Sequence, residues 1–471
     1  MPKSAIVLDP AAQGATLTEE KFPLAYRTEF HDFSQRTSAQ ASWLIALRRE
    51  GFTRFQETGF PTTHDEDWRF TNTSPITKTR FHLANADDSS VSAEDLKQED
   101  LKQFGVANFA CCLVFVNGRY SPRLSRIPAL PKGVKLGGLA AQLAANETYV
   151  ENHLGKYLNF RRDAFAALNT AFLEDGASLF VPRNTVVEEP IYVLYVSTSG
   201  KAALMDHPRN LIVAEAGSQA TIVEDYVSLD NLEPAFSNTA TELVAADNAV
   251  INHVMIVREN RQTNNISTLR IQQERSSNVS SHSILLGGGL VRNNVHPVLG
   301  GEGCECLING LFMGNESQHL DNYMLVEHAS PHCSSRQFYN GILAGQSHGV
   351  FHGRIIVHKD AQKTDAKQTN RNLLLSDDAL IDTKPQLEIY ADDVKCTHGA
   401  TIGKLEAAAL FYARSRGLDE ASARHLLLLA FANECLERMN EGAVRDHVER
   451  LITEWLPNST ETAEKKSARQ S

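Results

Sequence analysis

The chain has 471 residues, of which 42% are hydrophobic and 22% charged, and its formal net charge is −11. This composition is typical of a soluble globular protein, and the negative charge argues against a general affinity for nucleic acid. The longest strongly apolar run, 109–116, falls far short of the roughly 20 residues that a membrane-spanning helix needs, so no membrane association is expected.

The N-terminal part of the chain is predicted to be mainly helical. Residues 1–20 are small and polar and are expected to be flexible. From 22 to about 60, apolar residues recur at three- and four-residue steps, which is typical of helices with one buried face. A strand is predicted at 112–116, followed by Asn117-Gly118, a dipeptide typical of hairpin turns. We assign 21–177 to a mainly helical N-terminal domain.

The middle of the chain consists of short β-branched runs separated by Gly, Asn and Asp. Similar turn residues return at a weak period of about 31 residues, for example Gly314, Gly345 and Ser376. A period of this size built from short strands is typical of a solenoid whose coils stack on one another. The pattern therefore favours a parallel β-helix over 178–402, with an irregular β-sandwich as the alternative.

The C-terminal part is again helical. Three helices are predicted, at 404–415, 419–438 and 441–456. Together they form a helical domain at 403–456, which we expect to cap the open edge of the solenoid and to leave a surface for a partner. The run 426–431 is apolar around much of its helix and should be buried on more than one side. Residues 457–471 are polar and are expected to be a disordered tail.

Cys396 and His398 form the main candidate metal site in the sequence. In an extended strand, residues two apart point to the same side, so a thiolate and an imidazole could face one ion. These ligands suit iron, zinc or copper, but a closed site needs about four ligands. The alternative is a small buried Cys beside a surface His.

Other pairs of metal-binding residue types are less suitable. Two histidine pairs are spaced four residues apart, His328 with His332 and His348 with His352. In strands this spacing corresponds to about 13 Å, too far for one ion, so histidines hydrogen-bonded at solenoid turns are expected. Cys304 and Cys306 share a strand face, but free Cys is commonly a small buried residue. The seven scattered cysteines do not suggest a disulfide framework, and we expect a cytoplasmic protein.

Two enzymatic interpretations are considered from the residues. The run 399–404 superficially resembles a phosphate loop, but it has three residues between its glycines instead of four, and Leu405 follows the lysine. Any ATP hydrolysis must therefore come from another chain. A carbohydrate-active lyase or hydrolase built on a β-helix is the alternative function. It would need clustered carboxylates, whereas the Asp residues of this region show no repeated register, namely Asp360, Asp365, Asp392 and Asp393.

Several segments resemble the SufB/SufD family, the scaffold proteins of the SUF iron–sulfur cluster assembly machinery. The C-terminal signature is similar to 392–401 (Asp-Asp-Val-Lys-Cys-Thr-His-Gly-Ala-Thr) and 410–417 (Leu-Phe-Tyr-Ala-Arg-Ser-Arg-Gly). Further matches are Ala361-Gln362-Lys363-Thr364, 368–376, Pro61-Thr62-Thr63 and Glu66-Asp67-Trp68-Arg69-Phe70. The resemblance extends from about residue 20 to residue 456. The Trp-containing segment and the Lys-Cys-Thr-His-Gly run fit the SufD branch.

This resemblance implies a right-handed parallel β-helix and a non-catalytic scaffold subunit of a SufBCD complex. It also implies a SufB-like partner bound through the β-helix and a SufC-like ATPase bound through the C-terminal helices. The isolated chain is expected to hold no cofactor tightly, with an iron–sulfur cluster assembled transiently in the complex. Whether the isolated chain forms a homodimer stays open.

The resemblance also assigns site residues. His398 matches the histidine at the interface with the SufB-like subunit, and Cys396 matches the adjacent cysteine. The two are therefore candidates for a composite metal site completed by the partner. Four residues fall in the region that contacts the ATPase, namely Phe411, Tyr412, Arg414 and Arg416. Packing inside the helical domain is the alternative role for Phe411 and Tyr412.

Overall fold

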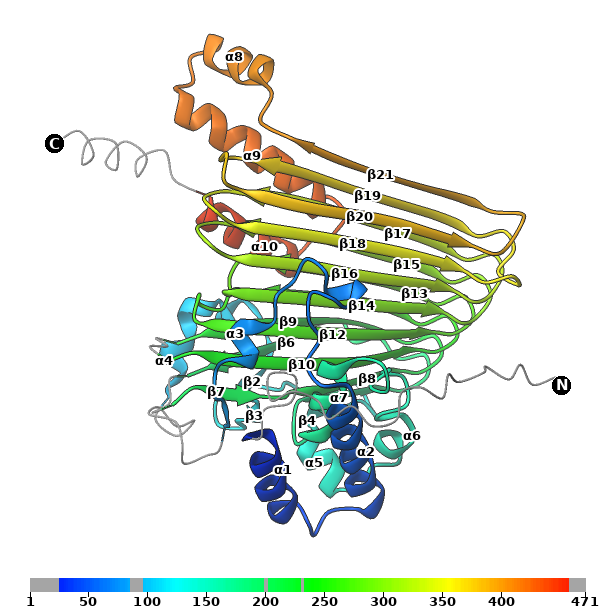
Figure 1. The fold of residues 1–471 in the computed structure, drawn as a ribbon. Helices are drawn as coiled ribbons and strands as arrows, with labels where there is room; N and C mark the ends of the chain where they lie inside the picture. The colour runs from blue at the N-terminus through cyan, green and yellow to red at the C-terminus, as the bar shows by residue number, and fades with distance from the viewer. Residues whose placement is uncertain (1–24, 85–95, 199–201, 230–232, 457–471) are drawn as a thin grey trace.

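The structure is a computed structural model in which a mainly β solenoid is flanked by N-terminal and C-terminal helices (Figure 1). It describes residues 25–84, 96–198, 202–229 and 233–456. The flexible segment expected at 1–20 and the tail expected at 457–471 lie outside the described residues. No helix in the described ranges is both long and apolar enough to cross a membrane.

The strands of the solenoid belong to two sheets. The 11-stranded sheet contains β1 (His82–Leu83), β4 (Lys135–Gly138), β5 (Ala177–Val181), β7 (Leu204–Asp206), β8 (Arg209–Ala214), β10 (Ala235–Ala245), β12 (Thr263–Gln273), β14 (Leu290–Leu299), β16 (His319–His328), β18 (His348–Val357) and β20 (Leu380–Ile389). The 10-stranded sheet contains β2 (Cys111–Val116), β3 (Arg119–Tyr120), β6 (Ile191–Ser197), β9 (Gln219–Ser228), β11 (Val250–Val257), β13 (Asn278–Leu285), β15 (Glu305–Gly314), β17 (Ser334–Leu343), β19 (Asp365–Leu374) and β21 (Lys395–Gly403).

Successive strands alternate between the two sheets, so the chain winds as a β-helix. From β8 to β20 in one sheet and from β6 to β21 in the other, neighbouring strands are parallel. This confirms the parallel β-helix and excludes the β-sandwich. Coil length varies: Gln219 pairs with Val250, whereas Asn264 pairs with Leu290 in a shorter coil. The expected period therefore describes some coils and not others, because the turns differ in length.

Side chains that alternate along each strand form two kinds of core. Inward-facing residues of both sheets build one continuous apolar interior, including Ile251, Phe312 and Phe351. Outward-facing residues of the 10-stranded sheet, such as Val254 and Leu311, belong to a separate core. Because neighbouring residues of a strand point to opposite faces, a coil contributes to both cores at once, and flanking helices cover the outer one.

The helices fall into an N-terminal and a C-terminal group. They are α1 (Ala25–Arg36), α2 (Ser42–Thr58), α3 (Ser74–Thr77), α4 (Gln98–Leu101), α5 (Leu139–Ala144), α6 (Thr148–His153), α7 (Ala164–Ala171), α8 (Ala407–Ser415), α9 (Glu420–Leu436) and α10 (Ala443–Trp455). The N-terminal helical prediction is correct in type, but α1 and α2 are two helices rather than one. The hairpin predicted at Asn117-Gly118 joins β2 to β3, and both turn residues have positive φ.

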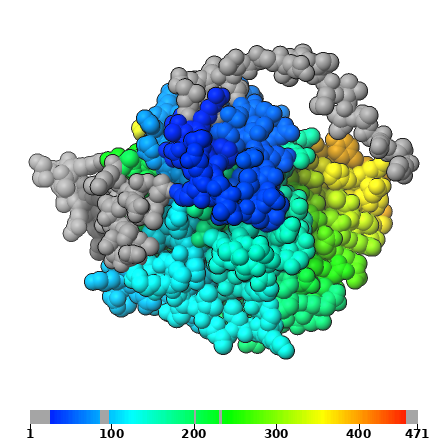
Figure 2. All heavy atoms as spheres, turned by 90° about the horizontal axis from the view of Figure 1, so that it is seen from below, coloured from blue at the N-terminus to red at the C-terminus, as the bar shows by residue number. Residues whose placement is uncertain are grey.

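The N-terminal group covers one end of the solenoid and part of the 11-stranded sheet. Aromatic residues of α1 and α2, including Phe33 and Phe55, pack with α7 against outward-facing Phe236 of β10. Figure 2, which looks at this end, shows it occupied by the blue and cyan residues of the N-terminal part. The coils at this end are therefore covered by residues of the same chain.

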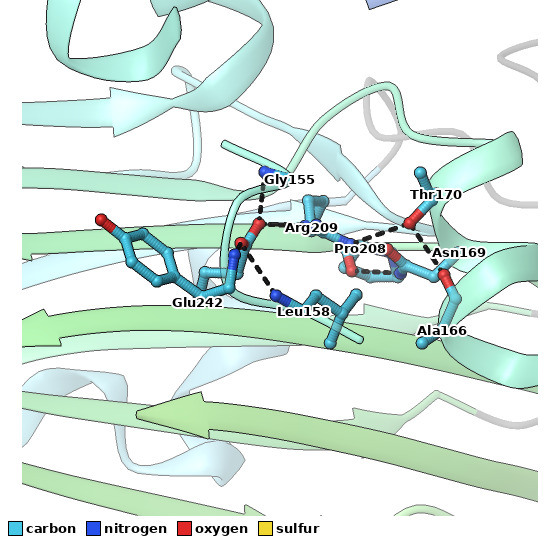
Figure 3. A network of polar contacts seen from close by, with 9 residues as sticks. Gly155, Leu158, Ala166, Asn169, Thr170, Pro208, Arg209 and Glu242 are labelled. Atoms are coloured by element: carbon cyan, nitrogen blue, oxygen red, sulfur yellow. Dashed lines mark hydrogen bonds and ion pairs between the residues drawn. The ribbon is translucent and has the colours of Figure 1, made fainter. Parts of the chain in front are cut away.

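A buried ion pair fixes this group to the sheet (Figure 3). Arg209 of β8 donates to the Glu242 carboxylate of β10 at 2.5 and 3.1 Å, and both side chains are fully buried. The same carboxylate accepts backbone N–H bonds from Gly155, Tyr157 and Leu158 at 2.8, 2.9 and 3.3 Å. Since a buried carboxylate needs such partners, Glu242 ties the loop after α6 to the solenoid.

The C-terminal helices α9 and α10 lie on the outer face of the 10-stranded sheet. Asn309 of β15 and Asn340 of β17 donate to the carbonyls of Cys435 and Phe431 on α9, both at 2.9 Å. Trp455 of α10 donates to the Leu286 carbonyl at 3.1 Å. The expectation that these helices cap the open edge is therefore wrong: their apolar faces match the outward-facing apolar rows of the sheet, and they pack there.

Candidate functional site: the open end of the solenoid

The last coil of the solenoid is formed by β20 and β21, each of which is the final strand of its sheet. β20 pairs only with β18 and β21 only with β19 in the described part of the chain. Each strand therefore leaves one row of backbone N–H and C=O groups without a ladder partner. Large apolar side chains are exposed around this end, including Leu380 (59%), Tyr390 (62%) and Ile402 (51%). We call this coil the open end.

Cys396 and His398 lie on β21, and the strand places them on its inward side. Cys396 is half-buried and packs against the interior apolar core. His398, two residues on, shares that face but is exposed because no further coil covers it. Burial raises the pKa of the Cys396 thiol. The predicted shared face is thus present, on the last strand of its sheet.

The coil beneath the pair presents a row of amide side chains. His398 is in register with Gln368 of β19, which is in register with Gln337 of β17. The Gln368 amide nitrogen donates to the Gln337 carbonyl oxygen. Gly353 on the opposite sheet makes room for this amide, since a Cβ there would lie 2.0 Å from its nitrogen. The side chains directly below His398, in the preceding coil, are therefore polar and tightly packed.

Among the described residues, no further ligand closes the Cys396–His398 pair. Across the described ranges, no group of three or more His, Cys, Asp or Glu side chains is arranged to hold a metal ion. A thiol and an imidazole are two of the roughly four donors that a structural site requires. The described residues therefore supply only part of a closed metal site at this pair.

Helix α8 follows β21 directly and carries the predicted ATPase-contacting residues. Phe411 and Tyr412 are 74% and 61% exposed, so they do not pack the helical domain of this chain. Arg416 extends over the Tyr412 ring at 5.2 Å and donates to its hydroxyl at 3.1 Å. Arg414 lies 3.9 Å from Glu420 at the start of α9. These side chains form an aromatic and basic surface, which we call the α8 surface.

The remaining histidine candidates have structural partners. His328 faces the interior and contacts the Ser335 hydroxyl at 2.8 Å. His348 and His352 lie on the outer face of β18, where they pair with Asp382 and Gln386, each at 2.8 Å. The expectation of hydrogen-bonded histidines is correct for these three residues. They lie on strands β16 and β18 rather than in turns.

The other enzymatic features also have structural explanations. Residues 399–403 continue strand β21 and do not form a loop at a helix N-terminus, as phosphate binding would need. Asp365 forms a surface ion pair with Arg336 at 2.8 Å, and Asp393 pairs with Lys363. Such solvated pairs are not an arrangement of acid and base flanking a scissile bond.

Two features of the open end could not be identified as such from the sequence. Gln368 lies within one of the segments that suggested the family, but nothing marked it as the residue beneath His398. Tyr390 and Ile402 look like ordinary strand residues until the coil that they terminate is known. The sequence signal for the open end was the end of the β pattern at 403, because the last coil of a solenoid has an unpaired edge.

Comparisons with known proteins agree with this architecture. The family model described as the SUF system FeS cluster assembly SufBD core domain matches residues 195–431, and that of the SufBD protein N-terminal region matches 21–193. A SufBD family iron–sulfur cluster assembly protein of Synechocystis sp. is 32% identical, over 83% of this chain and 87% of the relative. The iron–sulfur cluster assembly protein SufD of Escherichia coli is 30% identical (85% and 90%), and SufD of Bacillus subtilis is 27% identical (85% and 90%). The chain belongs to the SufBD family of the SUF iron–sulfur cluster assembly system.

Proposed function

We propose that this chain is a SufD-like scaffold subunit that works in a complex with a SufB-like subunit and a SufC-like ATPase. The observation that carries the proposal is the open end, where an unpaired coil, exposed apolar side chains and an incomplete Cys396–His398 pair occur together. Each of these features is unfavourable or incomplete in an isolated chain. A partner that covers the coil would complete all of them.

The first partner would dock on the open end. An unpaired strand edge recruits strands of another chain through main-chain hydrogen bonds. Exposed Leu380, Tyr390 and Ile402 supply apolar area for such a contact. A SufB-like subunit, itself a β-helix by family membership, offers strands of matching type. The proposed interface is therefore end-to-end packing of two solenoids.

The same docking would complete a composite metal site. His398 can offer a neutral ring nitrogen, and Cys396 can offer a thiolate once a metal displaces its proton. The raised pKa of Cys396 implies that the thiol stays protonated while the end is uncovered. We assign His398 the larger role, because it is exposed to an incoming ligand set whereas Cys396 packs on the core. An iron–sulfur cluster is the cargo of this site and leaves for an apo-protein.

The second partner would bind the α8 surface. Exposed aromatic and Arg side chains dominate the binding energy of many protein interfaces, and Phe411, Tyr412 and Arg416 are of these types. The described chain has no phosphate loop at 399–404, so ATP hydrolysis is assigned to the SufC-like partner. Because α8 follows β21 directly, movement of a bound ATPase would be transmitted to the open end.

The proposal is tested on the complex co-expressed with SufB-like and SufC-like subunits. His398→Ala and Cys396→Ala are compared with Thr397→Ala, a matched control on the same strand whose exposed side chain points to the opposite face. Iron and acid-labile sulfide are measured in each purified complex. We expect loss of cluster in His398→Ala with all subunits still present, a smaller loss in Cys396→Ala, and normal content in the control. Normal iron in the His398→Ala complex would refute the composite site, and failure of the wild-type chain to co-purify would refute the scaffold role.

A further inference from the structure

A second pair of cysteines occupies one column of the solenoid, far from the open end in sequence. Cys304 directly precedes β15 and Cys333 directly precedes β17, so both lie in equivalent turns of consecutive coils. Backbone hydrogen bonds between the coils include both residues. The Ser334 N–H donates to the Cys304 carbonyl at 2.9 Å, and the Asp365 N–H donates to the Cys333 carbonyl at 3.0 Å. The two residues are therefore stacked one above the other.

Their thiols converge on one oxygen. Cys304 Sγ lies 3.1 Å and Cys333 Sγ lies 3.2 Å from the carbonyl oxygen of Gly301. Both residues are almost fully buried, at 0% and 1% exposed. The turns that carry them, however, also contain Glu302 and His332, which are exposed to solvent. The pair is thus close to the surface without being freely accessible.

The same position carries a hydroxyl in three other coils and an apolar residue, Ala249 or Val394, in two more. Ser218, Ser277 and Thr364 each directly precede a strand and donate to the carbonyl three residues earlier, at 2.6, 2.7 and 2.8 Å. Cys304 makes the equivalent contact to Gly301. A hydroxyl therefore satisfies this turn completely. The turn geometry does not require sulfur at either position, and the thiols add chemistry that Ser would not.

The distance between the stacked positions of Cys304 and Cys333 suits a disulfide bond. Neighbouring strands lie about 4.8 Å apart, which falls within the range of Cα separations of roughly 4.4–6.8 Å found across disulfides. Side chains in register on adjacent parallel strands point the same way, as the shared acceptor shows for this pair. No large backbone movement is needed to bring the two sulfurs into bonding distance.

The environment also separates the two thiols in reactivity. The hydrogen bond from Cys333 lowers the pKa of Cys304, while the same interaction raises the pKa of Cys333. Burial raises the pKa of Cys111 to about 11 and that of Cys112 and Cys435 to about 12, and it also raises the pKa of Cys306. Since the thiolate is the nucleophile, Cys304 is the reactive thiol among these cysteines.

We propose that Cys304 and Cys333 form a redox-active dithiol that exchanges with low-molecular-weight disulfides and closes into a disulfide between consecutive coils. The Cys304 thiolate attacks one sulfur of the small disulfide, forms a mixed disulfide and releases one small thiolate. Cys333 loses its proton, attacks Cys304 Sγ and expels the second small thiolate. The protein dithiol is thus oxidised by two electrons, and one small disulfide is reduced to two thiols. This inference does not depend on the proposed function.

The test uses the folded full-length chain, reduced and then incubated with oxidised glutathione. Remaining thiols are alkylated, and the intact mass and the peptides of a non-reducing digest are determined. We expect a loss of two hydrogen atoms, a single link between the peptides that contain Cys304 and Cys333, and alkylation of the other five of the seven cysteines. Seven alkylated thiols, or a link between any other pair, would overturn the proposal.

Serine variants separate the two roles, because Ser occupies the same turn position in a neighbouring coil. Cys333→Ser should retain a glutathione adduct on Cys304. Cys304→Ser should lose this reactivity, so that Cys333 stays unmodified under the same conditions. Cys306→Ser, the control, should still form the disulfide at the wild-type rate. Circular dichroism establishes the fold of each variant, and if one does not fold, the wild-type peptide map alone decides. Reaction of Cys333 in folded Cys304→Ser would contradict the assignment of Cys304 as the attacking thiol.

Discussion

The guanidinium carbon of Arg292 lies 3.9 Å from the centroid of the Trp68 ring, which stacks the N-terminal segment on the outer face of the 11-stranded sheet. Arg292 is itself nearly buried and forms an ion pair with Asp321 on the next coil. Thr71 donates to the same Asp321 carboxylate at 2.5 Å. The Trp-containing segment that resembles the family therefore links β14 and β16, on two neighbouring coils, from the outside of the sheet. We call these contacts of Trp68 and Thr71 the strap.

Removing the Trp68 ring should weaken this strap. Trp68→Ala deletes the contact with Arg292 and the packing of the ring on Phe165, at 5.1 Å between centroids. We expect the free energy of unfolding to fall by about 2–3 kcal/mol, measured by urea denaturation. Trp68→Phe keeps an aromatic face and should lose about half as much. Equal stability of Trp68→Ala and wild type would show that the strap contributes nothing.

The buried Arg209–Glu242 pair should be sensitive to neutralisation. Glu242→Gln leaves the Arg209 charge buried without its counter-charge, and we expect destabilisation by about 3–5 kcal/mol. Asp247→Asn is the control, because the Asp247–Arg275 pair is exposed and should contribute less than about 1 kcal/mol. Chemical denaturation of both variants gives the comparison. A loss in Glu242→Gln no larger than in the control would contradict the structural role of the pair.

Acid should loosen the attachment of α10. Burial acts to raise the pKa of Asp225, but Arg258 and His447 outweigh it and lower the pKa to about 2. Because its folded-state pKa is depressed, ionised Asp225 stabilises the fold at pH values above the ordinary Asp value. This stabilisation, about 2 kcal/mol, is lost as the pH falls from about 4 to 2. Unfolding followed against pH should show this loss in wild type. Asp225→Asn should be less stable near neutral pH and should show a shallower decline in acid. An unchanged acid slope in the variant would exclude Asp225 as its source.

The α8 surface should matter for the partner and not for folding. Phe411→Ala and Tyr412→Ala remove side chains that are 74% and 61% exposed, so stability should change by less than about 0.5 kcal/mol. Association with a SufC-like ATPase should weaken by roughly 1–2 kcal/mol for each variant, measured by calorimetry. Ser415→Ala on the same helix is the matched control and should bind normally. Full affinity of the double Phe411/Tyr412 variant would place the ATPase elsewhere.

A charge placed at the open end should block docking. Ile402→Asp and Tyr390→Asp put a carboxylate on an edge that would otherwise pair with another chain. We expect each variant to fold normally and to lose co-purification with a SufB-like subunit while keeping the SufC-like ATPase. Val186→Asp introduces the same charge at an exposed Val (46%) away from the open end and should leave the complex intact. Retention of the SufB-like subunit by both edge variants would refute docking at this end.

Much of the local structure follows from local sequence. The C-terminal helices begin and end within about three residues of their predicted bounds, because apolar spacing and Gly punctuation act over a few residues. The two-residue spacing of Cys396 and His398 correctly predicts their common face, since strand geometry alone determines it. The exposure of Phe411 and Tyr412 could not be predicted, because an apolar helix face looks the same whether its own chain or another covers it.

By itself, the sequence determined the order of helices and strands, the solenoid class and the residues that share a strand face. All of these depend on periodicity over one coil or less. Only the tertiary structure decided that α9 and α10 cover a sheet face instead of the edge, that Gln368 lies beneath His398, and that Cys304 meets Cys333. The last two contacts join residues about 30 positions apart, and the helix contacts join residues 91 to 169 positions apart. Each depends on the lengths of the intervening turns, which vary from coil to coil and carry no periodic signal.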